Sequence, residues 1–143
     1  MIAVDTNLLV YAHRSGTAEH AAARRAIERA AADSRGWGVA LPCLAEFWSI
    51  VTHSSASGRP STPAEASAFV RALVAGGGAA VWGPARGFDA RLLALAERLR
   101  LSGPRIFDLQ IALIASEAGA TEMWSHDRRF VSIADLRLHD PLR

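Results

Sequence analysis

Short apolar segments alternate with longer helical patterns along almost the whole sequence. We expect β-strands at residues 2–4, 37–41, 79–82 and 121–125, with a short final strand at 137–139; the first of them is apolar throughout. The segments expected to be helical cover residues 8–12, 18–32, 42–53, 62–76, 88–101 and 106–118. Strands that alternate with helices in this way favour a parallel sheet with helices on both faces. The sequence therefore predicts an α/β fold around a parallel sheet of about five strands.

The first of these strands ends on the first candidate functional residue. Ile2, Ala3 and Val4 are apolar, and Asp5 follows them directly. In open α/β sheets, ligands bind beyond the carboxyl ends of the strands. Asp5 is therefore expected at a ligand-binding edge. A second interpretation, in which Asp5 only caps the helix that follows, fits this segment equally well.

The length and composition exclude several classes of protein and several kinds of catalytic mechanism. The length of 143 residues fits one domain, residues 1–143. All 16 basic residues are arginine, so every mechanism that needs a catalytic or phosphate-binding lysine is excluded. Cys43 is the one cysteine, which excludes an internal disulfide and a multi-thiolate metal site. No apolar run approaches the roughly 20 residues of a membrane-spanning helix, and no secretory signal is recognisable, so we expect a cytoplasmic protein.

Four acidic residues interrupt apolar patterns and need an explanation. Asp5 ends the first strand, Glu46 lies one turn into the helix after the second strand, and Asp108 lies early in the most apolar helix. Asp127 follows the fourth strand. An unpartnered carboxylate in a core is costly, so each acid needs a partner, and an individual arginine for each is one solution. Helices that leave the carboxyl edge of a parallel sheet begin near one another, so the simplest geometry gathers all four acids in one cleft.

Four carboxylates in one cleft would repel each other unless a counter-charge were present. Hard divalent cations prefer oxygen ligands and are the natural counter-charge. Two such ions, about 4 Å apart, can stabilise the attacking and leaving oxygens of a phosphoryl displacement. Metal-assisted phosphodiester hydrolysis is therefore the predicted chemistry. Thr6 and Ser125 are expected to support the metal shell, and Asn7 to orient Asp5.

Arginines near such a cleft are candidates for holding a nucleic-acid backbone through its phosphates. The candidates for RNA binding are Arg14, Arg105, Arg128 and Arg129. An arginine is more often a solvated surface residue, and that interpretation stays open for each of them.

The segments that carry the four acids resemble the motifs of the PIN-domain ribonucleases, and within them those of the VapC toxins of bacterial toxin–antitoxin pairs. The matching segments are DTNLLVYA at 5–12, PCLAEF at 42–47, FDLQIA at 107–112, SHDRRF at 125–130 and the tail at 136–142. The likeness spans nearly the whole chain and the motifs occur in the expected order. Two positions depart from the pattern: threonine is commoner than Ser125, and many relatives carry a further acid in place of Arg129.

The resemblance implies a three-layer α/β/α PIN fold and an endoribonuclease that depends on Mg²⁺ or Mn²⁺. One or two ions would be held by Asp5, Glu46, Asp108 and Asp127. The implied substrate is RNA (tRNA, rRNA or mRNA), and the implied partners are a second copy of the chain and a small VapB-type antitoxin. Apolar helical surface near Phe69, Leu73 and the first two helices is a candidate for the antitoxin groove or for the dimer contact.

Other functions remain open at this point. A housekeeping PIN nuclease would process RNA without an antitoxin, and a catalytically silent PIN module would bind RNA without cleaving it. A haloacid-dehalogenase-type phosphatase and a phosphoacceptor receiver domain also place acids after strands, but both need a lysine that this chain lacks. A neighbouring gene for a DNA-binding antitoxin would separate a toxin from a housekeeping enzyme. Metal-dependent cleavage by the purified chain would separate an enzyme from a silent module.

Overall fold

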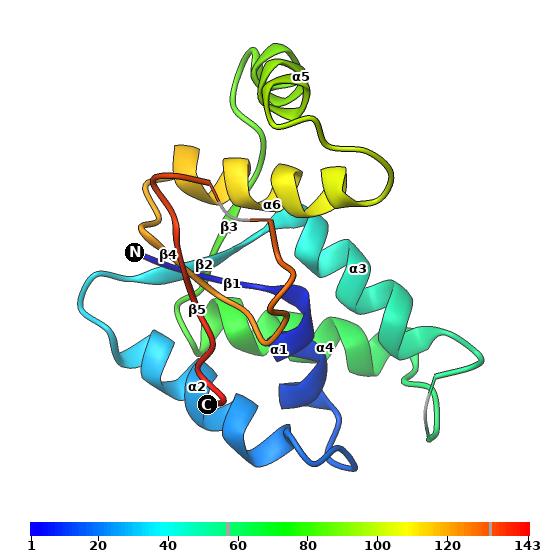
Figure 1. The fold of residues 1–143 in the computed structure, drawn as a ribbon. Coiled ribbons are helices and arrows are strands. Elements are labelled where there is room, and N and C mark those ends of the chain that lie inside the picture. Colours follow the sequence, from blue (N-terminus) through cyan, green and yellow to red (C-terminus); the bar gives the residue numbers. More distant parts are fainter. Residues whose placement is uncertain (57, 132) are drawn as a thin grey trace.

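The computed structural model describes residues 1–56, 58–131 and 133–143, and is built on a parallel sheet (Figure 1). Within these residues the sheet has 5 strands in the order β3-β2-β1-β4-β5, and every neighbouring pair is parallel. The strands are β1 (Ile2–Val4), β2 (Trp37–Ala40), β3 (Ala80–Trp82), β4 (Glu122–Trp124) and β5 (Arg137–His139). The predicted parallel sheet of about five strands is confirmed.

The burial of the strands follows their position in the sheet. Every residue of β1, β2 and β4 is buried, whereas β3 and β5, at the two edges, alternate between intermediate and exposed residues. A central strand of a parallel sheet is covered on both faces and needs a continuous apolar run, while an edge strand does not. This is why the apolar run at the amino terminus specifies a central strand.

Helices cover both faces of the sheet in a three-layer α/β/α arrangement (Figure 1). On one face α1 packs on α2 and α3, and α3 packs on α4. On the opposite face α6 packs on β2, and α5 lies outside α6. The helices are α1 (Thr6–His13), α2 (His20–Ala32), α3 (Leu41–Thr52), α4 (Pro63–Ala75), α5 (Phe88–Arg98) and α6 (Arg105–Glu117). All of the described helices correspond to segments predicted to be helical.

Local signals at the helix starts had different outcomes. A capping box forms at the start of α4: Thr62 Oγ1 accepts from the Glu65 backbone N–H and Glu65 Oε1 accepts from the Thr62 N–H, each over 3.1 Å. The segment Thr17-Ala18-Glu19-His20, which resembles a capping box with histidine at the third position, forms no such box. The Thr17 hydroxyl instead donates to the Arg14 carbonyl over 3.0 Å, and α2 begins only at His20. A histidine at the third position cannot supply the reciprocal acceptor that a glutamate gives.

A close approach between β2 and β3 explains the glycine in the middle of β2. A Cβ atom added at Gly38 would lie 2.6 Å from the Ala80 carbonyl oxygen and 2.6 Å from the Trp82 ring. The missing side chain therefore lets the Trp82 ring lie across β2. Trp37 is buried in the core beside it.

Two residues are placed differently from the sequence expectation. The helical spacing in α3 predicts that Trp48 faces the core with Phe47 and Val51, but Trp48 is 40% exposed while the other two are buried. Glu122 is expected to be solvated, yet it is 8% exposed at the start of β4. Arg35 and Arg137 each donate to its carboxylate over 2.9 Å, and so does the Trp124 indole N–H. The bond from Trp124, followed by that from Arg35, lowers the pKa of Glu122 to about 2.

Candidate active site

The order of the strands in the sheet brings the four predicted acids to one edge. Asp5 follows β1, and Asp127 lies in the loop after β4, which pairs with β1. Glu46 lies in α3, which leaves β2 on the other side of β1, and Asp108 lies in the first turn of α6. Since β2, β1 and β4 are adjacent and parallel, their carboxyl ends share an edge. The topology thus explains why acids up to 122 positions apart become neighbours.

Asp5 is buried and is held by neutral donors. Its carboxylate accepts from the Thr6 backbone N–H over 2.8 Å, from the Ser125 hydroxyl over 2.7 Å and from the Asn7 amide over 3.2 Å. Only 6% of the residue is exposed. It is also the N-cap of α1, so the predicted capping is confirmed, while ligand binding by Asp5 stays a prediction.

Burial raises the pKa of Asp5 to about 6, although the bonds from Ser125 and Thr6 act in the opposite direction. The charges of Asp108 and Glu46 raise it further. The ionised form of Asp5 is therefore destabilised by its surroundings, which is the condition that a bound cation would relieve.

The three predicted supporting residues connect the acids to each other. Thr6 donates from Oγ1 to Glu46 Oε2 over 2.8 Å. Asn7 donates from Nδ2 to Ser125 Oγ over 3.0 Å and accepts the His126 backbone N–H at Oδ1 over 3.1 Å. Ser125, only 1% exposed, also accepts the backbone N–H of Asp127 over 3.1 Å. One continuous network thus runs from α3 through the start of α1 to the loop after β4.

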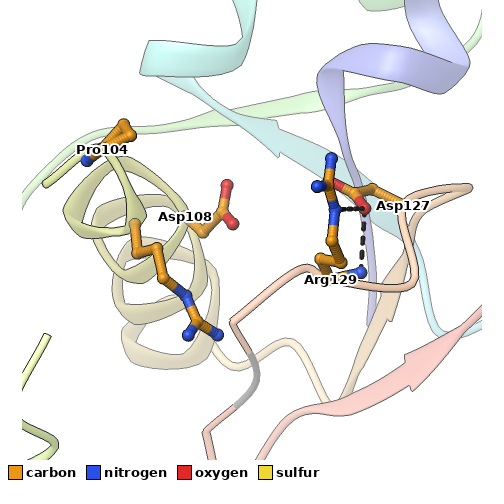
Figure 2. Close-up of a pocket in the computed structure, with 5 residues that line it drawn as sticks. Pro104, Asp108, Asp127 and Arg129 are labelled. Carbon is orange, nitrogen blue, oxygen red and sulfur yellow. Dashed lines mark hydrogen bonds and ion pairs between the residues drawn. The ribbon is translucent and has the colours of Figure 1, made fainter. Parts of the chain in front are cut away.

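Asp108 and Asp127 face each other across an open pocket of about 530 Å³ (Figure 2). Pro104, Arg105 and Arg129 complete its lining. Partial burial raises the pKa of Asp108, a backbone hydrogen bond at Val131 opposes this, and the charges of Asp127 and Glu46 raise it further. The four acids therefore interact electrostatically as one group.

The carboxylates are not individually neutralised by arginines. Within the described parts of the chain, Arg129 alone comes within ion-pair distance of any of the four, with its Nε 3.8 Å from Asp127 Oδ1. The Arg129 side chain is 94% exposed, and its backbone N–H bonds the same oxygen over 2.9 Å. A solvated contact of this kind contributes little. The interpretation that each acid has its own arginine does not describe this site.

The chemistry of the donor set fits a hard divalent cation. In the described residues, no three His, Cys, Asp or Glu side chains are already arranged as a metal-ligating group. Mg²⁺ keeps several of its waters and commonly takes only one or two protein carboxylates, so a closed cage of side chains is not required. The residues available to hold it are Asp5, Glu46, Asp108 and Asp127.

The predicted RNA-binding arginines separate into two groups. Arg105 and Arg129 line the acid pocket, and Arg128 is exposed on the same loop as Arg129. Arg14 does not belong with them, because its guanidinium donates to the Val51 and Arg59 carbonyls over 2.8 and 2.6 Å. It joins the end of α1 to the last turn of α3, at Val51, and to the loop that follows α3, at Arg59. We therefore leave Arg14 out of the candidate RNA-binding surface.

One contact near the site was not predicted from the sequence. His126 Nδ1 lies 2.9 and 3.0 Å from the two carboxylate oxygens of Asp140, and Arg143 Nε lies 3.1 Å from one of them. The C-terminal tail is thereby attached to the residue that precedes Asp127. A histidine and an aspartate 14 positions apart, each in a loop, give no periodic signal that would have revealed the pair.

Comparisons with known proteins identify the family of the chain. The PIN domain family matches residues 2–136. The VapC ribonuclease Mb2897 of Mycobacterium bovis and ribonuclease VapC43 of Mycobacterium tuberculosis are each 36% identical to the chain, over 99% of the chain and 96% of the relative. Ribonuclease VapC33 of Mycobacterium tuberculosis is 32% identical over 100% of the chain and 99% of the relative.

The fold has a clear counterpart among solved structures. The crystal structure of Mycobacterium tuberculosis VapC20, described as a sarcin–ricin loop cleaving toxin, aligns with a TM-score of 0.68 over 91% of the chain and 92% of that protein, at 16% identity. This likeness concerns the fold. The family match and the relatives over the full length show that the chain belongs to the VapC ribonucleases of the PIN-domain family.

Proposed function

We propose that this protein is a metal-dependent endoribonuclease toxin that cleaves RNA phosphodiester bonds and is neutralised by a VapB-type antitoxin. One observation carries the proposal: Asp5, Glu46, Asp108 and Asp127 lie at one sheet edge, and the buried Asp5 has neutral donors but no cationic partner among the described residues. The names of the relatives that match over the full length support an RNA substrate.

In the proposed mechanism the four carboxylates would hold one or two Mg²⁺ or Mn²⁺ ions. When bound, such ions would supply a water nucleophile and neutralise charge on the scissile phosphate. Ser125 and Asn7 fix the direction of the Asp5 carboxylate, and Thr6 does the same for Glu46. These neutral donors leave the negative charge of the carboxylates available to a cation.

The pocket rim supplies the groups that would bind the RNA backbone. Arg105 and Arg129 both line the pocket that contains Asp108 and Asp127. Phosphate contacts from arginine position a nucleic acid without reading its sequence. We propose that these two arginines, with the exposed Arg128, place the phosphodiester against the acids.

Several further properties are part of the proposal. We infer that residues 1–143 form a single PIN domain, because one buried apolar cluster includes residues from β1 to Leu136. The described helices are too short and too polar for one to cross a bilayer. A homodimer and a cytoplasmic location are expected from the family. A shallow depression formed by Ala12, Ile27, Phe69 and Leu73, among others, coincides with the surface expected to bind the antitoxin or a second copy.

Induced expression in a bacterial host tests the function. We expect growth arrest and new RNA ends at a small number of sites, detected by sequencing the 5′ ends of cellular RNA. Co-expression of the candidate antitoxin should restore growth and remove the new ends. Cleavage with normal growth, and without any effect of a partner, would favour a housekeeping nuclease. Absence of new ends would reject the nuclease assignment.

A further inference from the structure

A small apolar slot lies beside the acid group, between α3 and α6. Pro42 and Glu46 line it from α3, and Phe107, Gln110 and Ile111 line it from α6. These residues are spaced i, i+4 on α3 and i, i+3, i+4 on α6, so each set occupies one helix face. The slot adjoins the acids directly, because Glu46 is one of its walls and Phe107 precedes Asp108.

The side chains of the slot combine a flat apolar surface with an available polar group. Phe107 is 58% exposed and has no ring partner in the described structure, while Ile111 is 2% exposed and forms the floor. The Gln110 side-chain amide makes no hydrogen bond with any residue that the structure describes. An exposed phenyl ring and an unpaired amide are the two groups with which proteins stack on an unpaired base and read its edge.

We propose that this slot binds an unpaired nucleobase of the RNA, next to the phosphodiester held by the acids. The inference rests on the proposed nuclease function. Phe107 would stack on the base and Gln110 would hydrogen-bond its edge. The negative Glu46 disfavours a phosphate or an acidic side chain here, so the occupant is a neutral, flat group.

The size of the slot also favours a base over a protein segment. Its volume of about 200 Å³ is below the roughly 300 Å³ at which pockets for drug-sized ligands begin. It therefore accommodates one ring system and is too small for a helix. The rival occupant is a second copy of the chain, because α3 also exposes Leu41 (52%) and Trp48 (40%).

Binding of short RNA to the full-length chain tests the proposal. The chain would carry Asp5→Asn so that RNA is not cleaved, and the probes would be single-stranded hexaribonucleotides of adenylate, guanylate, cytidylate or uridylate. Phe107→Ala should weaken binding by about fivefold to a hundredfold, the range for loss of one stacked base. Phe107→Tyr, which keeps an aromatic ring, should bind the probes as tightly as the chain with Phe107. Gln110→Leu should reduce the differences in affinity among the four probes. The matched control is Trp48→Ala, an exposed aromatic on α3 outside the slot, which should leave affinity unchanged.

The outcomes separate this inference from the proposed function. If Phe107→Ala leaves all four affinities unchanged, the slot does not bind a base; if the same variant also converts a dimer to a monomer in sedimentation, the slot is a contact between copies. If the wild-type chain cleaves no RNA yet binding still depends on Phe107 and Gln110, the slot is supported and the nuclease function fails. Shifts of the Gln110 side-chain amide signals in NMR spectra on adding the probes would place the base directly.

Discussion

Ser125 Oγ donates a hydrogen bond of 2.7 Å to Oδ2 of Asp5, a residue 120 positions earlier in the chain. The same hydroxyl oxygen accepts bonds from Asn7 and from the backbone of Asp127. A single buried hydroxyl therefore positions two of the four acids. The strand pairing of β1 with β4 brings these residues together, so the sheet topology and the chemistry of the site depend on one another.

Ser125→Ala should lower RNA cleavage about tenfold to a hundredfold, the usual effect of removing a group that orients a metal ligand. The variant leaves Asp5, Asn7 and the Asp127 N–H without a shared partner. Ser125→Thr keeps the hydroxyl and should retain most of the activity. The rates of RNA cleavage by both variants, measured under saturating Mn²⁺, check this prediction. Equal losses of activity in the two variants would show that the hydroxyl does not position the acids.

Asp140→Ala should lower kcat about tenfold with little change in the melting temperature, because it releases His126 and with it the loop that carries Asp127. Asp140→Asn keeps an acceptor for His126 and should behave nearly as the wild type. The matched control is Asp135→Ala, which removes an exposed carboxylate from the same part of the chain. An equal effect of the Asp135 and Asp140 variants would contradict a specific role for the His126 contact.

Glu122 should make the protein more stable at neutral than at acidic pH. Its pKa is about 2 in the folded protein, below the usual 4.5, so its contribution is present above about pH 4.5 and is lost as the pH falls toward 2. Arg35 and Arg137 are 48% and 74% exposed, so solvent screening reduces the contribution to about 1–2 kcal/mol. Urea unfolding of the wild type and of Glu122→Gln at pH 6 and pH 3 measures it. A stability difference between the two proteins that is the same at both pH values would exclude this role.

Gly38→Ala should destabilise the fold by about 2 kcal/mol or more, since the new Cβ would lie 2.6 Å from a backbone oxygen that cannot move freely. The control is Gly16→Ala, where a Cβ meets nothing within 4 Å and the effect should stay within about 0.5 kcal/mol. Free energies of unfolding for the two variants provide the comparison. Similar values would mean that β2 and β3 do not approach as closely as described.

The local patterns of the sequence predicted the elements and the gathering of the acids because these depend on burial and on chain order. The continuous apolar run of β1 marks a central strand, and the order of a parallel sheet then brings Asp5 and Asp127 to one edge. The central strand and the shared edge can both be inferred without knowing which distant residues contact each other.

The contacts that the sequence did not reveal depend on distant partners. Glu122 is buried because Arg35 and Arg137 reach it from other parts of the chain, and His126 is held by a carboxylate in the tail. Arg14 resembles a free surface arginine in the sequence, but its guanidinium donates to the backbone carbonyls of Val51, in the last turn of α3, and of Arg59. Pairings of this kind have no periodicity, so only the three-dimensional structure identifies them.

The rate of RNA cleavage by purified Asp5→Asn, beside the wild-type chain, is the measurement that tests the nuclease assignment most directly. Both proteins would first be treated with EDTA and then supplied with Mg²⁺ or Mn²⁺. We expect the wild type to cleave only after metal is restored, and Asp5→Asn to remain inactive with an unchanged circular dichroism spectrum, since asparagine can still accept the Thr6 N–H. Cleavage by Asp5→Asn at the wild-type rate, or cleavage by the wild type in EDTA, would contradict a metal-dependent site built on these four carboxylates.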